Sequence, residues 1–359
     1  MFSSGHLSFK GRGEKWNSTD DGESIATEIS SVTKLEVLEL CGNSLGVDAS
    51  LPIAEAMKKH PELKKALWSD LFTSRLNTEI PLILKTLCNS MIVSGTRLTV
   101  LDLSDNAIGP QAIGALEEFL SGPTCFALKE LYLNNCGLGS AGINVAECLI
   151  KCHEAALRHN TIFDLQVFVA GRNRLENRGA KALAKAFKTL GTLVEVKMYQ
   201  NGVKQEGISA LAEAFEDCPN LKVLDLNDNT FGRRGAMQMA RVVGKLTKLQ
   251  VLNFGDCLCR RKGSESIVMN LAMNCSAIQE LRLNGNEIDV ETAQKIVQMC
   301  KSLPKITILD LQQNCYGRNW SILVSHFQKP FVDFGAESDD DGSRDGDTSE
   351  EESDKSDED

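Results

Sequence analysis

The fold is decided by the stretch Leu221-Lys-Val-Leu-Asp-Leu-Asn-Asp-Asn-Thr-Phe-Gly232. Leu224 and Leu226 alternate with the polar Asp225, which predicts a short strand whose apolar side points inward. Asn229 comes just after this strand and is expected to turn inward. Its side chain can then satisfy backbone groups that are left open where the strand ends.

This unit recurs along the chain at a nearly constant spacing. Its first apolar positions are separated by 28, 35, 30, 37, 28, 28, 28, 29 and 28 residues. Such a period predicts a leucine-rich repeat solenoid, in which each unit buries its apolar side only by stacking on its neighbours. We expect an α/β horseshoe with parallel concave strands and outer helices, formed by a cap at residues 1–34 and about ten repeats at residues 35–334. The first apolar positions are Leu35, Leu63, Leu98, Leu128, Leu165, Leu193, Leu221, Leu249, Ile278 and Ile306.

The asparagine slot and the stretch that follows it belong to the scaffold. Other repeats place asparagine or cysteine where Asn229 stands, and the cysteine is a known variant of the pattern. Each turn is followed by a stretch rich in Ala and Leu, such as residues 179–187, whose apolar residues fall at helical spacing. We therefore assign these positions to structure. The slot holds Asn43, Asn106, Asn173, Asn201, Asn286, Asn314, Cys136 and Cys257.

Composition favours an intracellular chain. The first ten residues lack the apolar core of a secretory signal, and no stretch approaches the roughly eighteen apolar residues of a membrane span. The twelve cysteines are scattered over repeat positions and helix faces, where a free thiol acts as a small hydrophobe. Cys148, Cys152 and His153 have no second ligand pair at zinc-site spacing. We expect reduced thiols and no bound metal.

The net charge of −10 comes from one end of the sequence. Residues 337–359 contain thirteen acidic and two basic side chains, so the rest of the chain is nearly neutral. Because this segment has no apolar residue to bury, residues 335–359 are predicted to be a disordered acidic tail. The tail could simply be solvated, or it could be an electrostatic arm for a basic partner surface. Its serines Ser349, Ser353 and Ser356 are candidates for an acidophilic kinase.

Two repeats are longer than the others. The repeat that begins at Leu128 carries its extra residues at 152–160, on the helical side, which predicts a longer helix and loop. The repeat that begins at Leu63 carries them at 68–81, directly after the strand, where a proline is placed to open the next helix. A loop at that edge can project toward a bound partner, with Arg75 as its cationic tip.

The outward-facing strand positions and the residues just after each strand form a broad polar surface. Its acidic, neutral and basic zones suit a folded protein partner better than a small apolar ligand. Nucleic acid is not expected, because a phosphate backbone requires a net basic stripe and this surface is rich in Asp. The surface comprises Glu39, Trp68, Asp70, Asp102, Asp105, Tyr132, Asn134, Asn135, Val169, Arg172, Lys197, Gln200, Asp225, Asp228, Asn253, Asp256 and Arg282.

Two common motifs of self-contained enzymes are missing. The sequence has no GxxxxGK[ST] or HExxH motif, and its five histidines do not cluster with a Cys or Ser nucleophile at a recognisable spacing. The residues alone therefore indicate a protein-binding solenoid.

Four segments carry a more specific signal. They are WSDLFTSRLNTEIP at 68–81, LYLNNCGLG at 131–139, VAGRNRLEN at 169–177 and LNDNTF at 226–231. With the opening LSFKG at 7–11 and the acidic tail, they make essentially the whole chain resemble the Ran GTPase-activating protein family. The leucine frame is shared by many unrelated repeat proteins, whereas the first and third segments are much more specific. Ser74 departs from the glycine that is usual in the family but leaves Arg75 in place.

The resemblance implies that the chain accelerates GTP hydrolysis by the small GTPase Ran, docked against one edge of the horseshoe. It would be an activator without an active site of its own. Nucleotide, magnesium and the water-orienting glutamine belong to the GTPase, so no cofactor is expected here, and a GTPase activator can add ~10⁵-fold. On chemistry alone Arg75 would be an arginine finger. The resemblance implies instead that Ran's own catalytic machinery is put in order.

The implied partner is Ran in its GTP form, alone or together with a Ran-binding protein. No nucleic-acid partner and no membrane insertion are expected, and the chain is expected to be monomeric. The resemblance also implies a location in the cytoplasm or at the cytoplasmic face of the nuclear envelope, where hydrolysis supports nucleocytoplasmic transport.

The resemblance assigns roles to particular residues. Asn135 would hold Ran's water-orienting glutamine through a side-chain amide hydrogen bond, with Asn134 as the fallback if the register is off by one. Arg75 would make a charge-assisted contact with the switch region of Ran. Asn135 could instead be a turn residue, and Arg75 a solvated loop arginine. Further partner contacts, each of which could equally be a solvated surface position, are expected from Asp70, Asn134, Arg172, Arg174, Lys197, Asp225 and Asp228.

Two non-catalytic interpretations remain. An inhibitor of the ribonuclease-inhibitor type shares the rhythm of 28 and 29 residues and a cysteine-rich interior, and a binding scaffold shares the horseshoe. Neither requires the Arg75 loop, the Asn134–Asn135 pair or the run at 171–177. An activator should turn over many GTPase molecules, whereas an inhibitor or a scaffold should only bind.

Overall fold

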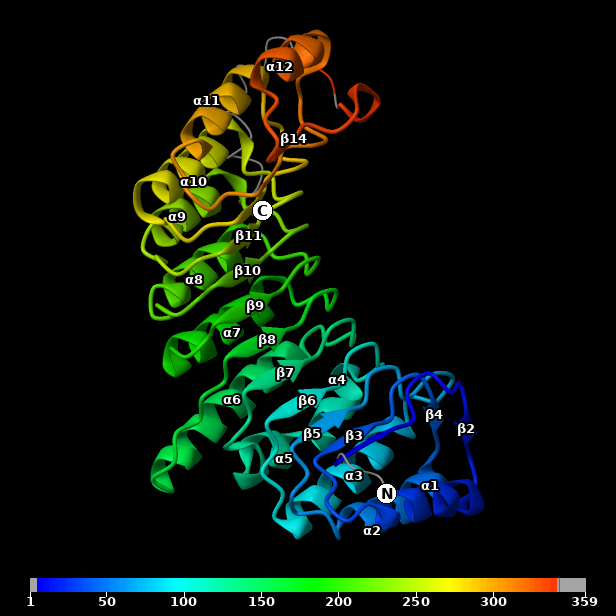
Figure 1. Ribbon diagram of the computed structural model, residues 1–359. Helices are drawn as coiled ribbons and strands as arrows, with labels where there is room; N and C mark the ends of the chain where they lie inside the picture. The colour runs from blue at the N-terminus through cyan, green and yellow to red at the C-terminus, as the bar shows by residue number, and fades with distance from the viewer. Residues whose placement is uncertain (1–4, 341, 343–359) are drawn as a thin grey trace. The chain divides into compact units, whose positions relative to one another are not determined.

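The computed structural model describes residues 5–340 and 342, and the chain divides into two compact units between Asn201 and Gly202. In both, short strands lie side by side and helices run along one side of them (Figure 1). Neighbouring strands within each unit pair in parallel. The predicted leucine-rich repeat architecture of parallel strands and outer helices is therefore confirmed.

The first unit contains a parallel sheet in the order β1-β3-β5-β6-β7-β8-β9. Its strands are β1 (His6–Ser8), β3 (Val37–Glu39), β5 (Lys65–Leu67), β6 (Val100–Asp102), β7 (Glu130–Tyr132), β8 (Val167–Val169) and β9 (Glu195–Lys197). A second, two-stranded sheet pairs β2 (Lys15–Trp16) with β4 (Ser44–Leu45). The helical segments are α1 (Thr19–Ser31), α2 (Val47–Met57), α3 (Ile80–Ser94), α4 (Gly109–Ala112), η1 (Ile113–Ala115), α5 (Glu117–Ser121), η2 (Pro123–Cys125), α6 (Ala141–Arg158) and α7 (Glu176–Leu190).

The second unit continues the same pattern, with strands in the order β10-β11-β12-β13-β14. They are β10 (Val223–Asp225), β11 (Val251–Asn253), β12 (Glu280–Arg282), β13 (Ile308–Asp310) and β14 (Val332–Asp333). The helical segments are α8 (Gln205–Phe215), α9 (Gly232–Val243), α10 (Arg260–Asn274), α11 (Val290–Cys300), η3 (Gly317–Asn319), α12 (Trp320–Phe327) and η4 (Glu337–Asp339).

The core follows the predicted frame. Nine of the ten first apolar positions are buried, and only Ile306, near the last full repeat, is half-buried. Helix α7 buries Ala180, Leu183 and Phe187 on one face, as the helical spacing predicted. Helix α6 is 18 residues long and contains most of the extra residues of its repeat. Each repeat therefore closes its apolar side against its neighbours.

The asparagine slot ties consecutive repeats together. The Asn106 amide nitrogen donates to the backbone oxygens of Trp68 (2.8 Å) and Leu103 (2.9 Å). Its oxygen accepts from the backbone nitrogens of Leu71 (2.8 Å) and Phe72 (3.1 Å). One side chain thus satisfies two donors and two acceptors of two repeats, which confirms the scaffold interpretation.

Cysteine performs part of the same task. The Cys136 thiol donates to the backbone oxygen of Leu103 at 3.1 Å, and the Cys257 thiol donates to that of Leu226 at 3.2 Å. All twelve cysteines are buried and unpaired with one another. Burial raises the pKa of the Cys136 thiol to about 12. These thiols are packed scaffold positions.

Two positions of the predicted polar surface are buried. Val169 occupies the outer slot of β8, but it is only 8% exposed. Trp68 was placed on the polar surface, but its side chain is fully buried, and Leu67 occupies the outer slot of β5. Four consecutive residues, Lys65 to Trp68, contain three apolar side chains, so the alternation that sets the inward side is ambiguous in this repeat.

The packed chain extends to residue 340. Tyr316 donates its backbone N–H to the carboxylate of Asp340 at 2.6 Å, just after η4. The predicted boundary between residues 334 and 335 falls inside this segment. The remainder of the predicted acidic tail, including Ser349, Ser353 and Ser356, lies outside the described residues. Of the helices that the structure describes, none is long and apolar enough to cross a membrane.

Candidate functional site

The predicted site residues of the first unit gather where its strands end. We call the turns after β5, β6, β7, β8 and β9 the strand-end row; it consists of residues 69–70, 104–105, 134–135, 171–172 and 199–200. Backbone hydrogen bonds link each turn to the next. They run from Asp70 N to Ser104 O (2.9 Å), Asp105 N to Asn134 O (2.8 Å), Asn135 N to Gly171 O (2.8 Å) and Arg172 N to Tyr199 O (2.9 Å).

The row repeats one backbone conformation. Asp70, Asn135 and Arg172 have φ values of 47°, 52° and 57°, in the left-handed region. Asn and Asp tolerate this region better than most residues, whereas arginine gains nothing from it. Each occupies the position just before the inward slot of its repeat. Asn135 is therefore a turn residue by conformation, which leaves its exposed side chain available for contacts.

Asn134 and Asn135 place two amides next to each other. The Asn135 Nδ2 donates to the carboxylate of Asp105 at 2.9 Å, so its Oδ1 points toward solvent. The half-buried Asn134 accepts a hydrogen bond on Oδ1 from the Tyr199 hydroxyl at 2.6 Å. Its backbone N–H donates to the Ser104 hydroxyl at 3.2 Å. The pair therefore leaves the Asn135 Oδ1 and the Asn134 Nδ2 for a partner on the same edge.

The Arg75 loop, residues 69–79, is fastened to the N-terminal repeat. The Arg75 Nη2 donates to the backbone oxygens of Ser44 (2.7 Å) and Trp16 (3.3 Å). A Cβ atom on Gly46 would lie 3.0 Å from Nη1, so glycine allows this close approach. Arg75 is half-buried, which corrects the expectation of a freely projecting tip. The guanidinium thus reaches back to backbone carbonyl groups of β2 and β4.

The Arg75 charge is nevertheless not neutralised. Within residues 5–340 and 342, no carboxylate lies within ion-pair distance of its guanidinium, and its Nε is buried without an acceptor. Backbone carbonyls satisfy donors but carry no net charge. The loop thus holds a cation next to the strand-end row. Ser74, just before it, has a φ of 64°, which explains why glycine suits this position.

The basic residues in and beside the row differ in whether they are held by an ion pair. Arg172 and Arg174 are exposed, and no ion pair among the described residues holds either. Lys197 pairs with Glu195 on the same strand, 2.7 Å away. Arg172 and Arg174 are therefore the available cations at this edge.

Asp225 and Asp228 belong to the second unit, so the structure does not place them against the strand-end row. The Asp225 carboxylate accepts from the backbone nitrogen of Asn227 at 3.0 Å, which closes the turn after β10. Asp228 is exposed and has a φ of 53°. Both lie at a strand end, in the same type of turn as the predicted residues of the first unit.

Tyr199 belongs to the site, although it is not among the residues predicted from the sequence. It occupies the same repeat position as Asn134 and Gly171 in the two preceding repeats. A glycine at this position, between repeats that place Asn and Tyr there, was the sequence signal that could have identified Tyr199. Nearby, Tyr132 donates from its hydroxyl to Glu130 at 2.8 Å, and burial followed by this hydrogen bond raises the pKa of Tyr132. In the part of the chain that the structure describes, no group of His, Cys, Asp and Glu side chains could hold a metal ion.

Comparisons with known proteins agree with the motif analysis. A family model described as leucine-rich repeat matches residues 96–116 and 217–240. Over 200 residues the chain is 49% identical to Ran GTPase-activating protein 1 of Xenopus laevis, and over 198 residues it is 44% identical to the Ran GTPase-activating protein of Drosophila melanogaster. Ran GTPase-activating protein 2 of Caenorhabditis elegans is 44% identical over 200 residues. The resemblance to this group of proteins is confirmed.

These matches are partial. Each covers 55% of this chain but only 34%, 33% and 21% of the respective relative. The matched part thus spans about a third or less of the length of these relatives. A solved internalin from Listeria monocytogenes aligns over 92% of this chain and 86% of that chain, with 17% identity and a TM-score of 0.46.

Proposed function

We propose that this chain, which resembles Ran GTPase-activating proteins, accelerates GTP hydrolysis by Ran in its GTP form. The strand-end row would dock on the switch regions of Ran, alone or together with a Ran-binding protein. GTP, magnesium and the catalytic glutamine come with the partner, so the chain needs no cofactor. It acts as a monomer in the cytoplasm or at the cytoplasmic face of the nuclear envelope, in support of nucleocytoplasmic transport.

The observation that supports this function most is the pair of neighbouring amides at Asn134 and Asn135. Their backbones are tied to the turns on both sides, and Asn135 leaves an amide oxygen exposed. A glutamine side chain carries both an amide donor and an amide acceptor, so an asparagine can hold it in one orientation. Ordering the glutamine that orients the attacking water is a positioning contribution to the rate.

The geometry of Arg75 favours docking over insertion. An arginine finger would have to leave the backbone oxygens of Ser44 and Trp16 in order to reach into the partner. In place, the guanidinium still presents Nη1 and an uncompensated positive charge to an acidic group of Ran. Arg75 thus fixes the docking pose while Ran's own residues perform the chemistry. The exposed cations Arg172 and Arg174 extend the contact.

The test is phosphate release from Ran loaded with GTP, at catalytic amounts of the chain. We compare the intact chain with Arg75→Ala and Asn135→Ala. The matched control is Gln313→Ala, because Gln313 is exposed and occupies the same left-handed turn position, with φ of 53°, in the second unit. We expect many turnovers with the intact chain and the control, and a strong loss in the other two variants.

The outcomes separate the candidate functions. An acceleration near the ~10⁵-fold that such activators reach corresponds to about 7 kcal/mol of barrier. If the intact chain binds Ran but leaves hydrolysis at the intrinsic rate, the activator function is wrong and a binding scaffold remains. If Gln313→Ala loses as much activity as Asn135→Ala, the site is not on the strand-end row of the first unit.

A further inference from the structure

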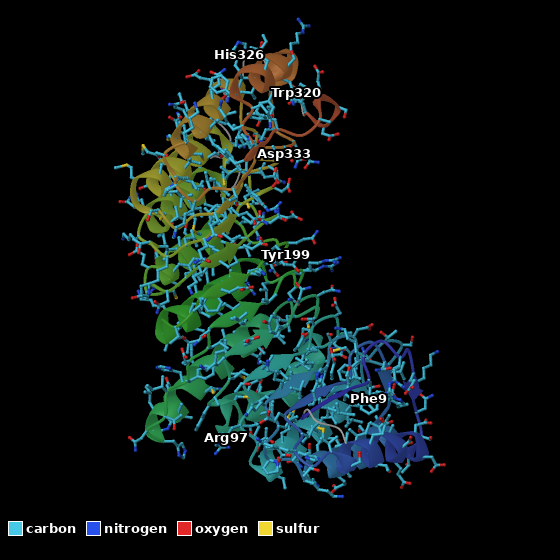
Figure 2. All side chains as sticks on the ribbon, viewed as in Figure 1. Phe9, Arg97, Tyr199, Trp320, His326 and Asp333 are labelled. Atoms are coloured by element: carbon cyan, nitrogen blue, oxygen red, sulfur yellow. The ribbon has the colours of Figure 1, made fainter. Side chains whose placement is uncertain are left out.

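Tyr199 bridges three consecutive repeats of the first unit. It follows β9, and its ring lies over Gly171, which follows β8, so that its hydroxyl reaches Asn134 after β7. Figure 2 shows Tyr199 on the side of its repeat away from the helices. Neighbouring strands are about 4.8 Å apart, so a side chain must span two strand spacings to make this contact. Tyrosine is long and rigid enough to do so.

Gly171 is required for the bridge. A Cβ atom at this position would lie 2.5, 2.6 and 2.7 Å from three ring carbons of Tyr199, closer than real contacts allow. The φ of Gly171 is not positive, so glycine is not needed there for the backbone. Its backbone oxygen accepts from Asn135 N at 2.8 Å and from Asn173 Nδ2 at 3.0 Å, which keeps it in place. The glycine therefore serves the passage of the tyrosine ring.

The contact decides how Asn134 is presented. The Tyr199 hydroxyl has Asn134 Oδ1 as its hydrogen-bond acceptor at 2.6 Å, so the amide oxygen faces the ring and Nδ2 faces outward. The Asn134 backbone is held on the other side by Ser104 and by Asp105. Both the backbone and the side chain of Asn134 are then fixed, next to the exposed amide of Asn135.

We propose that Tyr199 is a positioning residue for GTPase activation, which orients the Asn134 amide so that Asn134 and Asn135 present one ordered pair of amides to the partner. The inference rests on the proposed function. Tyr199 acts through Asn134 and makes no contact with the reacting atoms. Losing the orientation should slow the hydrolysis step within the complex while leaving the docking surface intact.

The decisive variant is Tyr199→Phe, which retains the ring over Gly171 and removes only the hydroxyl. With Ran loaded with GTP, we expect kcat to fall about fivefold and KM to change less than twofold. A fivefold change in rate corresponds to the net contribution of one neutral hydrogen bond. In an Asn134→Ala background, Tyr199→Phe should have no further effect on kcat. The matched control is Tyr316→Phe, which removes a buried hydroxyl bonded to Leu311 O at 2.7 Å in the second unit and should leave kcat unchanged.

A second measurement does not require Ran. It follows the NMR signal of the Asn134 side-chain amide in a chain labelled with ¹⁵N at asparagine. The signal is assigned by its loss in Asn134→Asp. Tyr199→Phe should shift this signal and leave those of the inward asparagines in place. Gly171→Ala should shift it too, because the added Cβ displaces the ring.

The outcomes are distinct. If the Asn134 signal does not respond to Tyr199→Phe, or if the two substitutions reduce kcat independently, the positioning role is overturned. An increase in KM with unchanged kcat would also overturn it, because Tyr199 would then only contribute to docking. If the signal responds but the intact chain does not accelerate hydrolysis at all, the proposed function fails, and the role of Tyr199 in catalysis fails with it.

Discussion

Replacing Asn173 by alanine should destabilise the first unit more than any exposed substitution at the same edge. The side chain is fully buried. Its Nδ2 donates to the backbone oxygens of Leu133 (2.7 Å) and Gly171 (3.0 Å). Its Oδ1 accepts from the backbone nitrogens of Cys136 (2.9 Å) and Leu138 (3.2 Å). Alanine removes all four hydrogen bonds and leaves two buried N–H groups without an acceptor.

The magnitude follows from these contacts. A neutral hydrogen bond contributes about 1 kcal/mol, and a buried donor left unsatisfied costs about 1–3 kcal/mol. Four lost bonds, of which two leave buried donors, give an expected loss of about 4 kcal/mol in the free energy of unfolding. Asn173→Cys is the matched comparison, because Cys136 fills the same slot in the preceding repeat and still donates to a backbone oxygen there. We expect Cys to recover a part of the loss.

The assay is urea unfolding followed by circular dichroism. The free energy of unfolding must fall with urea concentration at the same slope in all variants, so that only stability is compared. A loss below about 1 kcal/mol for Asn173→Ala would contradict the reasoning on buried donors. So would equal losses for the alanine and cysteine variants. Because Asn173 caps the turn that contains Asn134 and Asn135, its loss should also reduce GTPase activation at temperatures where the chain remains folded.

Three further predictions concern acid stability, thiol reactivity and the Arg75 loop. Burial opposes ionisation of Glu62, but hydrogen bonds from His60 (2.9 Å) and from the backbone of Leu35 (2.8 Å) outweigh it, so its pKa lies below the ordinary 4.5. The stabilisation that ionised Glu62 contributes is therefore present above pH 4.5 and lost as the pH falls. Glu62→Gln should make the melting temperature depend less on pH in the acid range. An unchanged dependence would contradict this. All twelve cysteines are buried, and burial raises the pKa of the Cys259 and Cys300 thiols. A thiol reagent at pH 8 should therefore modify almost no cysteine in the folded chain and all twelve in denaturant, whereas rapid labelling of the native chain would contradict the burial. Arg75→Ala removes the donor that serves both backbone oxygens, so it should speed proteolytic cleavage within residues 69–79 while lowering the free energy of unfolding by at most about 2 kcal/mol. Unchanged cleavage would show that the loop is held by other contacts.

The repeat frame could be predicted because its information is local. Leu224, Leu226 and Asn229 lie within a few residues of one another, and the same short pattern returns in each repeat, so the burial of one unit predicts that of the next. The error at Trp68 shows where this reasoning stops. A strand with apolar residues on both sides has no alternation to read, and its inward side is set by the neighbouring repeats.

The candidate site was predicted in part. The Arg75 loop, Asn134 and Asn135 were found from their segments, and they do follow the ends of strands in the first unit. The direction of the Arg75 guanidinium was not predictable, because its acceptors are 59 and 31 residues away in sequence. Tyr199 was missed for the same reason, since its partner Asn134 is 65 residues away.

The sequence by itself determined the leucine-rich repeat fold, the inward asparagine and cysteine positions and the segments that resemble Ran GTPase-activating proteins. Each of these depends on residue type at short, regular spacing. Only the tertiary structure decided that Arg75 rests on the backbone of the N-terminal repeat, and that Tyr199 passes over Gly171 to orient Asn134. Stacking brings residues from different repeats within hydrogen-bond distance, and side-chain direction across repeats is set by that stacking.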